Sequence, residues 1–194
     1  LCMTYKTSLR KEKIQERDSI STKERDLAEK NTAAHFMNTY RELDFEKISI
    51  YFPIKNEVST EIITSFIRES GKKCFLPLID KDLNNKEMKF SEFTSEASLV
   101  KNKFNIPESL NSSLVIASEL ELVIMPLVAF DNKGYRLGMG QGYYDFTFKN
   151  FQLNKKQVFL GLAYDFQKTE SCYPEEHDLK MDAVICPSGI YKFS

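Results

Sequence analysis

The N-terminal part of the chain carries its apolar side chains at the spacing of helices. Residues 5–20 are strongly charged and have only a thin apolar stripe at Leu9 and Ile14, which predicts a helix with one weakly apolar face. The segment Ser21-Thr-Lys-Glu24 has the composition of a capping box, in which a serine and a glutamate satisfy backbone N–H groups reciprocally. A second helix is therefore predicted from about residue 22 to residue 41.

After residue 41 the pattern changes to short apolar runs separated by helical stretches. The apolar runs predict strands at 47–52, 73–76, 88–93, 122–125, 158–163 and 183–186. Helices are expected from Glu57 to just before Gly71 and from about 144 to 150, while the stretch from 94 to 113 is polar. Pro77 and Pro126 are expected to end the strands before them. The alternation predicts an α/β fold: a single domain over 1–194 with a largely parallel central sheet flanked by helices.

Charge, hydropathy and cysteine usage narrow the class of protein. The 27 basic and 28 acidic side chains nearly cancel, so nucleic acid is not an expected partner. No apolar run approaches about 18 residues and no apolar leader is visible, so neither a membrane partner nor secretion is expected. The cysteines, Cys2, Cys74, Cys172 and Cys186, form no C-x-x-C pair, and with only 2 histidines a zinc site is not expected. Cys74 and Cys186 are interpreted as buried free thiols, and a cytoplasmic location fits best.

Glycine is concentrated in one segment that follows an apolar strand. Of the 7 glycines, four lie close together, at Gly134, Gly138, Gly140 and Gly142. Glycine loses the most conformational freedom on folding, so such a cluster indicates positive φ angles or a close approach to a ligand. The spacing matches neither a Walker A loop nor G-x-G-x-x-G, yet successive backbone N–H groups here would form an anion-binding concavity at the carboxyl end of a strand. The same segment contains an arginine, two tyrosines and a carboxylate: Arg136, Tyr143, Tyr144 and Asp145. These side chains favour an active site over the alternative, a mobile surface loop.

Carboxylates elsewhere have both a functional and a structural interpretation. Asp145, Asp178 and Asp182 are candidate Mg²⁺ ligands because this ion takes hard oxygen donors, although a single aspartate is equally typical of a helix cap or a solvated surface. Glu57 opens a predicted helix, where the helix dipole favours a carboxylate in any case.

Two cations near the N-terminus form a further candidate site. Lys6 and Arg10 are four residues apart and share one helix face, which either holds phosphates or is simply solvated. His35 and His177 have no partner visible in the sequence and are assigned no role.

Together these segments resemble the 5-formyltetrahydrofolate cyclo-ligase family, whose members are also called methenyltetrahydrofolate synthetases. The resemblance extends along nearly the whole chain, and its most specific block runs from Pro126 to Asp145. The other matching segments are Lys6-Thr-Ser-Leu9-Arg10, Ile50–Phe52, Asn56–Thr60, Gly71–Lys73, Leu76-Pro77, Met88–Phe90, His177-Asp178 and Met181-Asp182.

The resemblance implies a ligase that uses ATP and Mg²⁺ to convert 5-formyltetrahydrofolate to 5,10-methenyltetrahydrofolate, with release of ADP and phosphate. The resemblance is compatible with both the monoglutamate and the polyglutamate form of this substrate. The implied fold is shared with ribose-5-phosphate isomerase and CoA transferases. By position, Arg136 and Tyr143 match the catalytic residues, and Asp145 and Asp182 match the magnesium ligands. The ATP-binding segments match Lys6, Thr7, Ser8, Leu9, Arg10, Arg136, Leu137, Gly138, Met139, Gly140, Gln141, Gly142, Tyr143 and Tyr144. The folate contacts match Phe52, Glu57, Met139, Gly140, Gln141, Gly142 and Tyr143.

The implied chemistry suits a chain without a recognisable catalytic triad. A phosphoryl group on the formyl oxygen turns a poor leaving group into a good one, and catalysis of that transfer is mainly positioning and charge stabilisation. Met139 and Gln141 differ from residues common in relatives, which leaves their side-chain contacts open. Two other classes remain open from the residues alone: a sugar-phosphate isomerase on the same fold, and a folate- or nucleotide-binding module without turnover.

Overall fold

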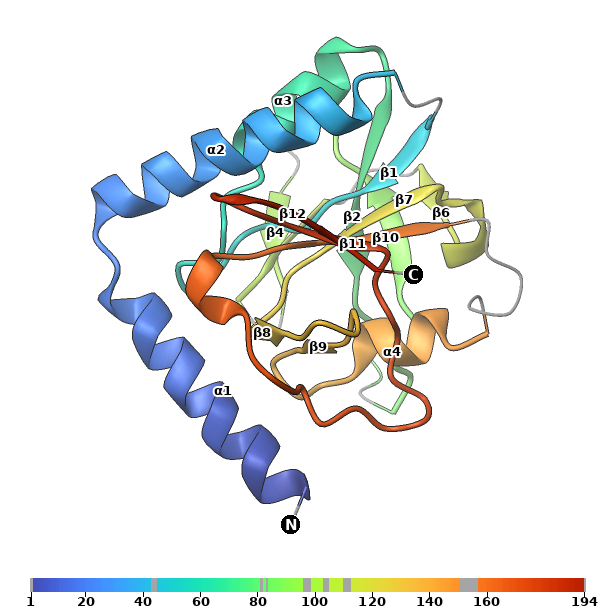
Figure 1. Cartoon of the computed structure of the whole chain (residues 1–194). Helices are drawn as coiled ribbons and strands as arrows, with labels where there is room; N and C mark the ends of the chain where they lie inside the picture. The colour runs from blue at the N-terminus through green and yellow to red at the C-terminus, as the bar shows by residue number, and fades with distance from the viewer. Residues whose placement is uncertain are drawn as a thin grey trace.

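The computed structural model describes residues 2–42, 45–80, 82, 84–95, 99–102, 105–109, 113–150 and 157–193 (Figure 1). The helices are α1 (Cys2–Ser19), α2 (Thr22–Tyr40), α3 (Glu61–Glu69) and α4 (Tyr143–Phe148), with 3-10 turns η2 (Ala117–Glu119) and η4 (Asp165–Gln167). The strands are β1 (Lys47–Ser49), β2 (Lys73–Leu78), β3 (Lys89–Glu92), β4 (Leu99–Lys101), β5 (Pro107–Ser109), β6 (Leu114–Val115), β7 (Leu122–Met125), β8 (Ala129–Phe130), β9 (Arg136–Leu137), β10 (Val158–Leu162), β11 (Ala183–Cys186) and β12 (Gly189–Lys192).

One 8-stranded sheet runs through the molecule in the order β12-β11-β10-β7-β1-β2-β3-β6. The five central strands are parallel to one another, in the order β11, β10, β7, β1 and β2. The edges are antiparallel, with β12 on one side and β3 and β6 on the other. Two small hairpins, β4-β5 and β8-β9, lie outside this sheet. The predicted α/β fold with a largely parallel sheet is confirmed.

The core has two layers because the strands alternate their side chains between the two faces of the sheet. In β7, Leu122 and Ile124 belong to the cluster beneath α2 and α3, whereas Val123 and Met125 belong to the cluster that contains Phe148 of α4. All of β7 is buried, as expected of a central strand covered by helices on both sides. α1 stands apart from these layers, along the side of the molecule (Figure 1).

The helix predictions are confirmed with small changes at the ends. The capping box is present: the Ser21 hydroxyl accepts from the Glu24 backbone N–H at 3.2 Å, and a Glu24 carboxylate oxygen accepts from the Ser21 N–H at 2.7 Å. α3 begins at Glu61, after the predicted start at Glu57, and ends before Gly71, which has a φ of 76°. Glu57 therefore does not open the helix, because the turn that fixes residues 55 and 56 precedes it. The last predicted helix lies at Tyr143–Phe148 instead of about 144 to 150.

The prediction that Pro77 ends its strand is wrong, since β2 continues to Leu78 and Pro77 lies opposite Phe90 of β3. β1 has already ended at Ser49, opposite Phe75, so the side of β2 that faces β1 needs no further N–H donor. β1 is also shorter than the predicted 47–52.

Strands of two to four residues escaped prediction. The hairpin β4-β5 lies in the stretch 94–113, interpreted as merely polar, of which residues 96–98, 103–104 and 110–112 lie outside the described residues. The strands β6, β8, β9 and β12 were also not predicted.

The prediction that Cys74 and Cys186 are buried free thiols is confirmed. Cys74 and Cys186 are buried and free, as is Cys172, and burial raises the pKa of each of these thiols to about 12. Within the described ranges, no helix combines the length and apolar character needed to cross a membrane.

Candidate functional site

The candidate site is built from the segments that follow the carboxyl ends of three adjacent parallel strands. Residues 51–58 follow β1, residues 126–142 follow β7 and include the hairpin β8-β9, and η4 follows β10. α1 packs against β8 and η4, and so lies beside these segments (Figure 1). Ligands of open α/β sheets bind at this edge.

Asp131 organises the turn of the β8-β9 hairpin. It is 1% exposed, and one carboxylate oxygen accepts from the N–H groups of Lys133 at 2.9 Å and Tyr135 at 3.2 Å. The other oxygen accepts from the Cys172 N–H at 3.0 Å, which ties the hairpin to the segment that follows η4. The role of Asp131 is therefore structural.

The glycine segment has the backbone conformation that its composition predicted. Gly134, Gly140 and Gly142 have φ angles of 86°, 91° and 71°, in the region that other residues avoid. A side chain at Gly134 would also collide with the Met181 carbonyl oxygen, because its Cβ would lie 2.9 Å away. The expectation of positive φ angles is confirmed at these three glycines.

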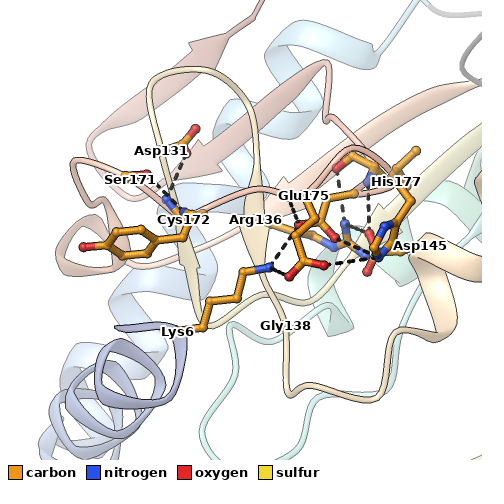
Figure 2. Close-up of polar contacts among 12 residues, drawn as sticks. Lys6, Asp131, Arg136, Gly138, Asp145, Ser171, Cys172, Glu175 and His177 are labelled. Carbon is orange, nitrogen blue, oxygen red and sulfur yellow. Dashed lines mark hydrogen bonds and ion pairs between the residues drawn. The ribbon is translucent and has the colours of Figure 1, made fainter. Parts of the chain in front are cut away.

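The cations of α1 face this segment. The Arg10 Nε donates to the Gly138 carbonyl at 2.8 Å, and a Cβ on Gly140 would lie 3.5 Å from the Arg10 guanidinium carbon. The Lys6 Nζ donates to Glu175 Oε1 at 2.9 Å and to Asp178 Oδ2 at 3.3 Å (Figure 2). Burial lowers the pKa of Lys6, but the hydrogen bonds and charges of the two carboxylates outweigh it and raise the pKa. Both cations therefore point into the site, and the simply solvated helix face is ruled out.

Arg136 and Asp145 form an ion pair inside the site (Figure 2). The Arg136 Nη1 donates to Asp145 Oδ1 at 2.9 Å and to the Leu179 carbonyl at 3.4 Å. The same aspartate oxygen accepts from the Leu179 N–H at 3.0 Å. The Arg136 guanidinium carbon lies 5.6 Å from the centre of the Tyr144 ring. Arg136 is only 9% exposed, so its position is fixed by packing as well as by charge.

The two predicted magnesium ligands have different surroundings. Asp182 Oδ2 accepts from the Phe159 N–H at 2.8 Å at the start of β10, and the Asp182 charge, after burial, raises the pKa of Tyr40 at the end of α2. This is the amino end of the parallel strands. Asp178, in contrast, directly precedes Leu179, whose N–H group Asp145 binds. The structure thus brings Asp178, not Asp182, beside Asp145.

Glu57 lies in a second, more buried part of the site. Its side chain is 7% exposed, Oε2 accepts from the Ile54 N–H at 3.0 Å, and Oε1 is 3.9 Å from Arg17 Nη1. Burial raises the pKa of Glu57, although the Ile54 N–H and the charges of Arg17 and Lys55 act in the opposite direction.

The turn before Glu57 has an unusual backbone. Lys55 and Asn56 have φ angles of 47° and 58°, which are uncommon for residues other than glycine. Asn56 is held from two sides, since its side-chain oxygen accepts from Arg25 at 2.8 Å and its carbonyl accepts from the Tyr164 hydroxyl at 3.0 Å. Such conformations persist where the surroundings fix them, often at functional sites.

Arg17 was missed by sequence reasoning. It is 1% exposed, and within the described part of the chain none of its three guanidinium nitrogens has a hydrogen-bond partner. It lies three residues after Ile14, so a charge on the weakly apolar face of α1 was the signal that could have identified it. The Tyr144 hydroxyl is likewise buried without such a partner among the described residues.

Tyr144 connects the two parts of the site. Its ring faces Arg136, and burial raises the pKa of its hydroxyl well above the ordinary value, with the Arg136 charge lowering it and the Glu57 charge raising it. Tyr144 is thus in contact with Arg136 and feels the charge of the buried Glu57 carboxylate.

The remaining predicted site residues are distributed around these two parts. Met139, Gly140, Gln141 and Gly142 are exposed on the glycine segment, and Tyr143 is half-buried at the start of α4. Phe52 is half-buried against the core. On α1, Thr7 and Ser8 are exposed, whereas Leu9 packs against the cluster of Ala129, Leu137 and Cys172.

Comparison with known proteins places the chain in a family. The sequence profile of the 5-formyltetrahydrofolate cyclo-ligase family matches residues 2–187. A 5-formyltetrahydrofolate cyclo-ligase of Haemophilus influenzae is 32% identical over 171 residues, which cover 87% of this chain and 90% of the relative. The protein of that name from Escherichia coli is 31% identical over 183 residues, or 93% of this chain and 100% of the relative. The NMR structure of Aquifex aeolicus 5,10-methenyltetrahydrofolate synthetase has a TM-score of 0.80 and 27% identity, over 96% of this chain and 92% of that one. The chain is a ligase that belongs to the 5-formyltetrahydrofolate cyclo-ligase family.

Proposed function

We propose that this protein converts 5-formyltetrahydrofolate to 5,10-methenyltetrahydrofolate with ATP and Mg²⁺, and releases ADP and phosphate. The observation that carries the proposal is the gathering of Lys6, Arg10 and Arg136 around the glycine segment and residues 175–179, together with the buried carboxylate of Glu57, whose charge acts on Tyr144. A polyanion and a nitrogen heterocycle are the two kinds of ligand that such a site suits. Family membership gives the sugar-phosphate isomerase alternative no support.

The cation-rich part suits the phosphates of ATP. Backbone N–H groups of a glycine segment bind phosphate oxygens, and Arg10 lies directly against this segment. Lys6 is held by Glu175 and Asp178, so phosphate binding would exchange one set of negative partners for another. Arg136 offers a planar fork of N–H donors, which suits charge developing on a transferred phosphoryl group.

The carboxylates that suit Mg²⁺ are Asp145 and Asp178. Their side chains are 23% and 19% exposed, so a hydrated ion can reach them. No group of three or more metal-binding side chains occurs among the described residues, but Mg²⁺ bound to nucleotide needs only one or two carboxylates besides phosphates and water. The ion would neutralise phosphate charge. Asp182, predicted as the second ligand, is less well placed because it binds the start of β10.

The buried part suits the pterin ring of the folate. An ionised carboxylate can accept two hydrogen bonds from the 2-amino group and the adjacent ring N–H of a pterin. Phe52 belongs to the same segment after β1 as Glu57, and Met139 is exposed on the glycine segment, so both would be available for the folate contacts that the resemblance implies. Tyr143 and Arg136 would flank the reacting groups between the two ligands.

The proposed mechanism needs positioning more than covalent help from the protein. The formyl oxygen attacks the γ-phosphorus of ATP, which yields ADP and a phosphorylated formyl group. The N10 amine then attacks the formyl carbon and loses its proton, and phosphate departs as the ring closes. Arg136 would stabilise the transferred phosphoryl group, while Glu57 would fix the ring that carries the formyl group.

The test is turnover measured by the absorbance of the methenyl product. Product should form only when 5-formyltetrahydrofolate, ATP and Mg²⁺ are all present, with one ADP released for each product molecule. Equal rates with and without nucleotide would show that the proposed reaction is wrong. Binding of both ligands without product would indicate a binding module.

A further inference from the structure

Arg17 poses a physical problem that the fold alone does not solve. A guanidinium group has five N–H donors and stays charged, so burying it without acceptors is unfavourable. Arg17 is 1% exposed, and among the described residues it forms an ion pair with Glu57, at 3.9 Å between Nη1 and Oε1. The two charges are close enough to attract each other as an ion pair, but 3.9 Å is too long for a hydrogen bond. Buried polar groups in folded proteins are almost always hydrogen-bonded, so Arg17 points to a ligand that supplies the acceptor.

The neighbourhood of Arg17 is organised for recognition. Tyr51 and Tyr164 belong to one buried cluster, and their hydroxyls donate to the carbonyls of Val58 and Asn56, the two neighbours of Glu57. The Arg17 charge lowers the pKa of both hydroxyls, against the stronger effect of burial. The turn that carries Glu57 is fixed through Asn56. The Arg17 N–H donors and the Glu57 acceptor therefore stand side by side on rigid elements, α1 and a braced turn.

A donor beside an acceptor recognises a ring edge of complementary polarity. The pyrimidine half of a pterin carries a 2-amino group, a ring N–H and a 4-oxo oxygen along one edge. The two N–H groups match the carboxylate of Glu57, and the oxygen next to them matches a guanidinium group. An analogue with a 4-amino group keeps the 2-amino group, but its neutral ring has no hydrogen on N3, and an N–H donor replaces the oxygen that would face the guanidinium group.

We propose that Arg17 is a specificity-determining residue that donates a hydrogen bond to the 4-oxo oxygen of the pterin held by Glu57. The proposal rests on the proposed function, because it takes the pterin as the ligand of this region. It predicts that Arg17 distinguishes a 4-oxo ring from a 4-amino ring, whose N–H donors would face the N–H donors of Arg17 without an acceptor between them.

The experiment measures binding of two probes, 5-formyltetrahydrofolate and its 4-amino-4-deoxy counterpart, to wild type and Arg17→Met. The variant should bind the 4-oxo probe about tenfold or more weakly, the loss expected for one charge-assisted hydrogen bond. Its affinity for the 4-amino probe should be unchanged or higher. Its melting temperature without ligand should fall, because the substitution leaves the buried carboxylate of Glu57 without its ion-pair partner, so binding is measured well below the melting temperature.

The matched control is Arg25→Met, which removes the donor that holds Asn56 in the turn before Glu57. This variant acts through the position of Glu57, which contacts the 2-amino group of both rings, so both probes should bind more weakly. Equal losses, or no loss, in Arg17→Met would overturn the proposal. If Arg17→Met does not fold, Arg17→Gln decides: its amide can donate to a 4-oxo oxygen or accept from a 4-amino group, so the preference for the 4-oxo probe should fall, and unchanged selectivity would refute the role.

The proposed function and this inference fail separately. If wild type forms no methenyl product with MgATP and 5-formyltetrahydrofolate, the proposed function is wrong. If wild type turns over normally while Arg17→Met keeps the selectivity of wild type, only the role of Arg17 is wrong.

Discussion

At the scale of single residues, some polar groups of the site already have hydrogen-bond partners within the chain and others have none among the described residues. Lys6 and Arg136 have carboxylate partners within the chain, at 2.9 Å in each case. Phosphate oxygens would compete with those partners, so these cations offer exchangeable contacts of modest net strength. Arg17 and the Tyr144 hydroxyl lack hydrogen bonds among the described residues, so a ligand would add contacts there without breaking any. Affinity for the heterocycle is therefore expected to depend most on the buried part.

Replacement of Glu57 should affect folate far more than ATP. In Glu57→Gln, an amide replaces an acceptor that can bind two N–H donors, and each charge-assisted bond contributes about 1.5–3 kcal/mol. The KM for folate should rise about tenfold or more, and the KM for ATP should stay near that of wild type. Steady-state kinetics with each substrate varied in turn would check this. A change confined to ATP would show that Glu57 belongs to the other ligand.

The raised pKa of Glu57 also predicts how folate binding depends on pH. Burial makes the carboxylate protonate at a higher pH than its ordinary value of 4.5, and the protonated group is a poor acceptor for the pterin N–H groups. Folate affinity should therefore fall as the pH is lowered through this raised pKa, starting above 4.5. Titrations across this range should give a flat profile for Glu57→Gln. If Glu57→Gln loses folate affinity at low pH in the same way as wild type, the loss is caused by another titrating group.

Arg136 should act on the rate of the reaction. Arg136→Ala is expected to lower kcat by about 10²- to 10³-fold, the loss typical of one preorganised donor to a transition state. Arg136→Lys should recover only part of the rate, because an ammonium group is a point charge and not a planar fork. Since Arg136 is buried against Asp145, melting curves must accompany the kinetics. Near-wild-type kcat in a folded alanine variant would leave Arg136 with a structural role only.

At the scale of elements, the site depends on how α1, the glycine segment and residues 175–179 meet. Sequence patterns located α1 and predicted the positive φ angles of the glycines, because both follow from local chemistry. The patterns did not show that Asp178 and not Asp182 lies beside Asp145, since that choice depends on long-range contacts. The hairpin β8-β9 was missed because each strand has only two residues. The sequence patterns therefore predicted the individual segments of the site, but not which residues of distant segments contact each other.

The choice between the two aspartates can be tested through magnesium. Asp145→Asn and Asp178→Asn should each lower activity sharply at low Mg²⁺ and recover in part as Mg²⁺ is raised, because an amide is a weaker ligand for a hard ion. The double variant should lose less than the product of the two, since ligands of one ion act together. Mg²⁺ titrations of activity would measure this.

Asp182→Asn is the matched control for that series. Its carboxylate binds the Phe159 N–H at the start of β10, so its loss should lower the melting temperature without moving the Mg²⁺ curve. If the Mg²⁺ curve shifts in Asp182→Asn and not in Asp178→Asn, the magnesium ligands are Asp145 and Asp182, as the family resemblance implies.

At the scale of the whole molecule, the sheet and its two helical layers form a body to which α1 is attached mainly by polar contacts. α2 buries Ala28, Thr32, Ala33 and Phe36, whereas α1 has a charged surface and packs with Leu9 at the hairpin. The sequence predicted this difference, since the stripe on α1 is thin. α1 nevertheless supplies Lys6, Arg10 and Arg17, so ligand binding and attachment of this helix are coupled.

This coupling predicts that ligands protect α1 from hydrogen exchange. Without ligands, amides of α1 should exchange faster than those of α2, because fewer buried apolar contacts must break to release the helix. MgATP at about 100 times its Kd should slow their exchange by up to about 100-fold, if release of α1 abolishes nucleotide binding. Lys6→Met should lose most of this protection, while the amides of α3 should respond little in either protein. Hydrogen exchange followed by mass spectrometry would resolve the helices, and an α1 as protected as α2 before any ligand is added would show that it is part of the rigid body.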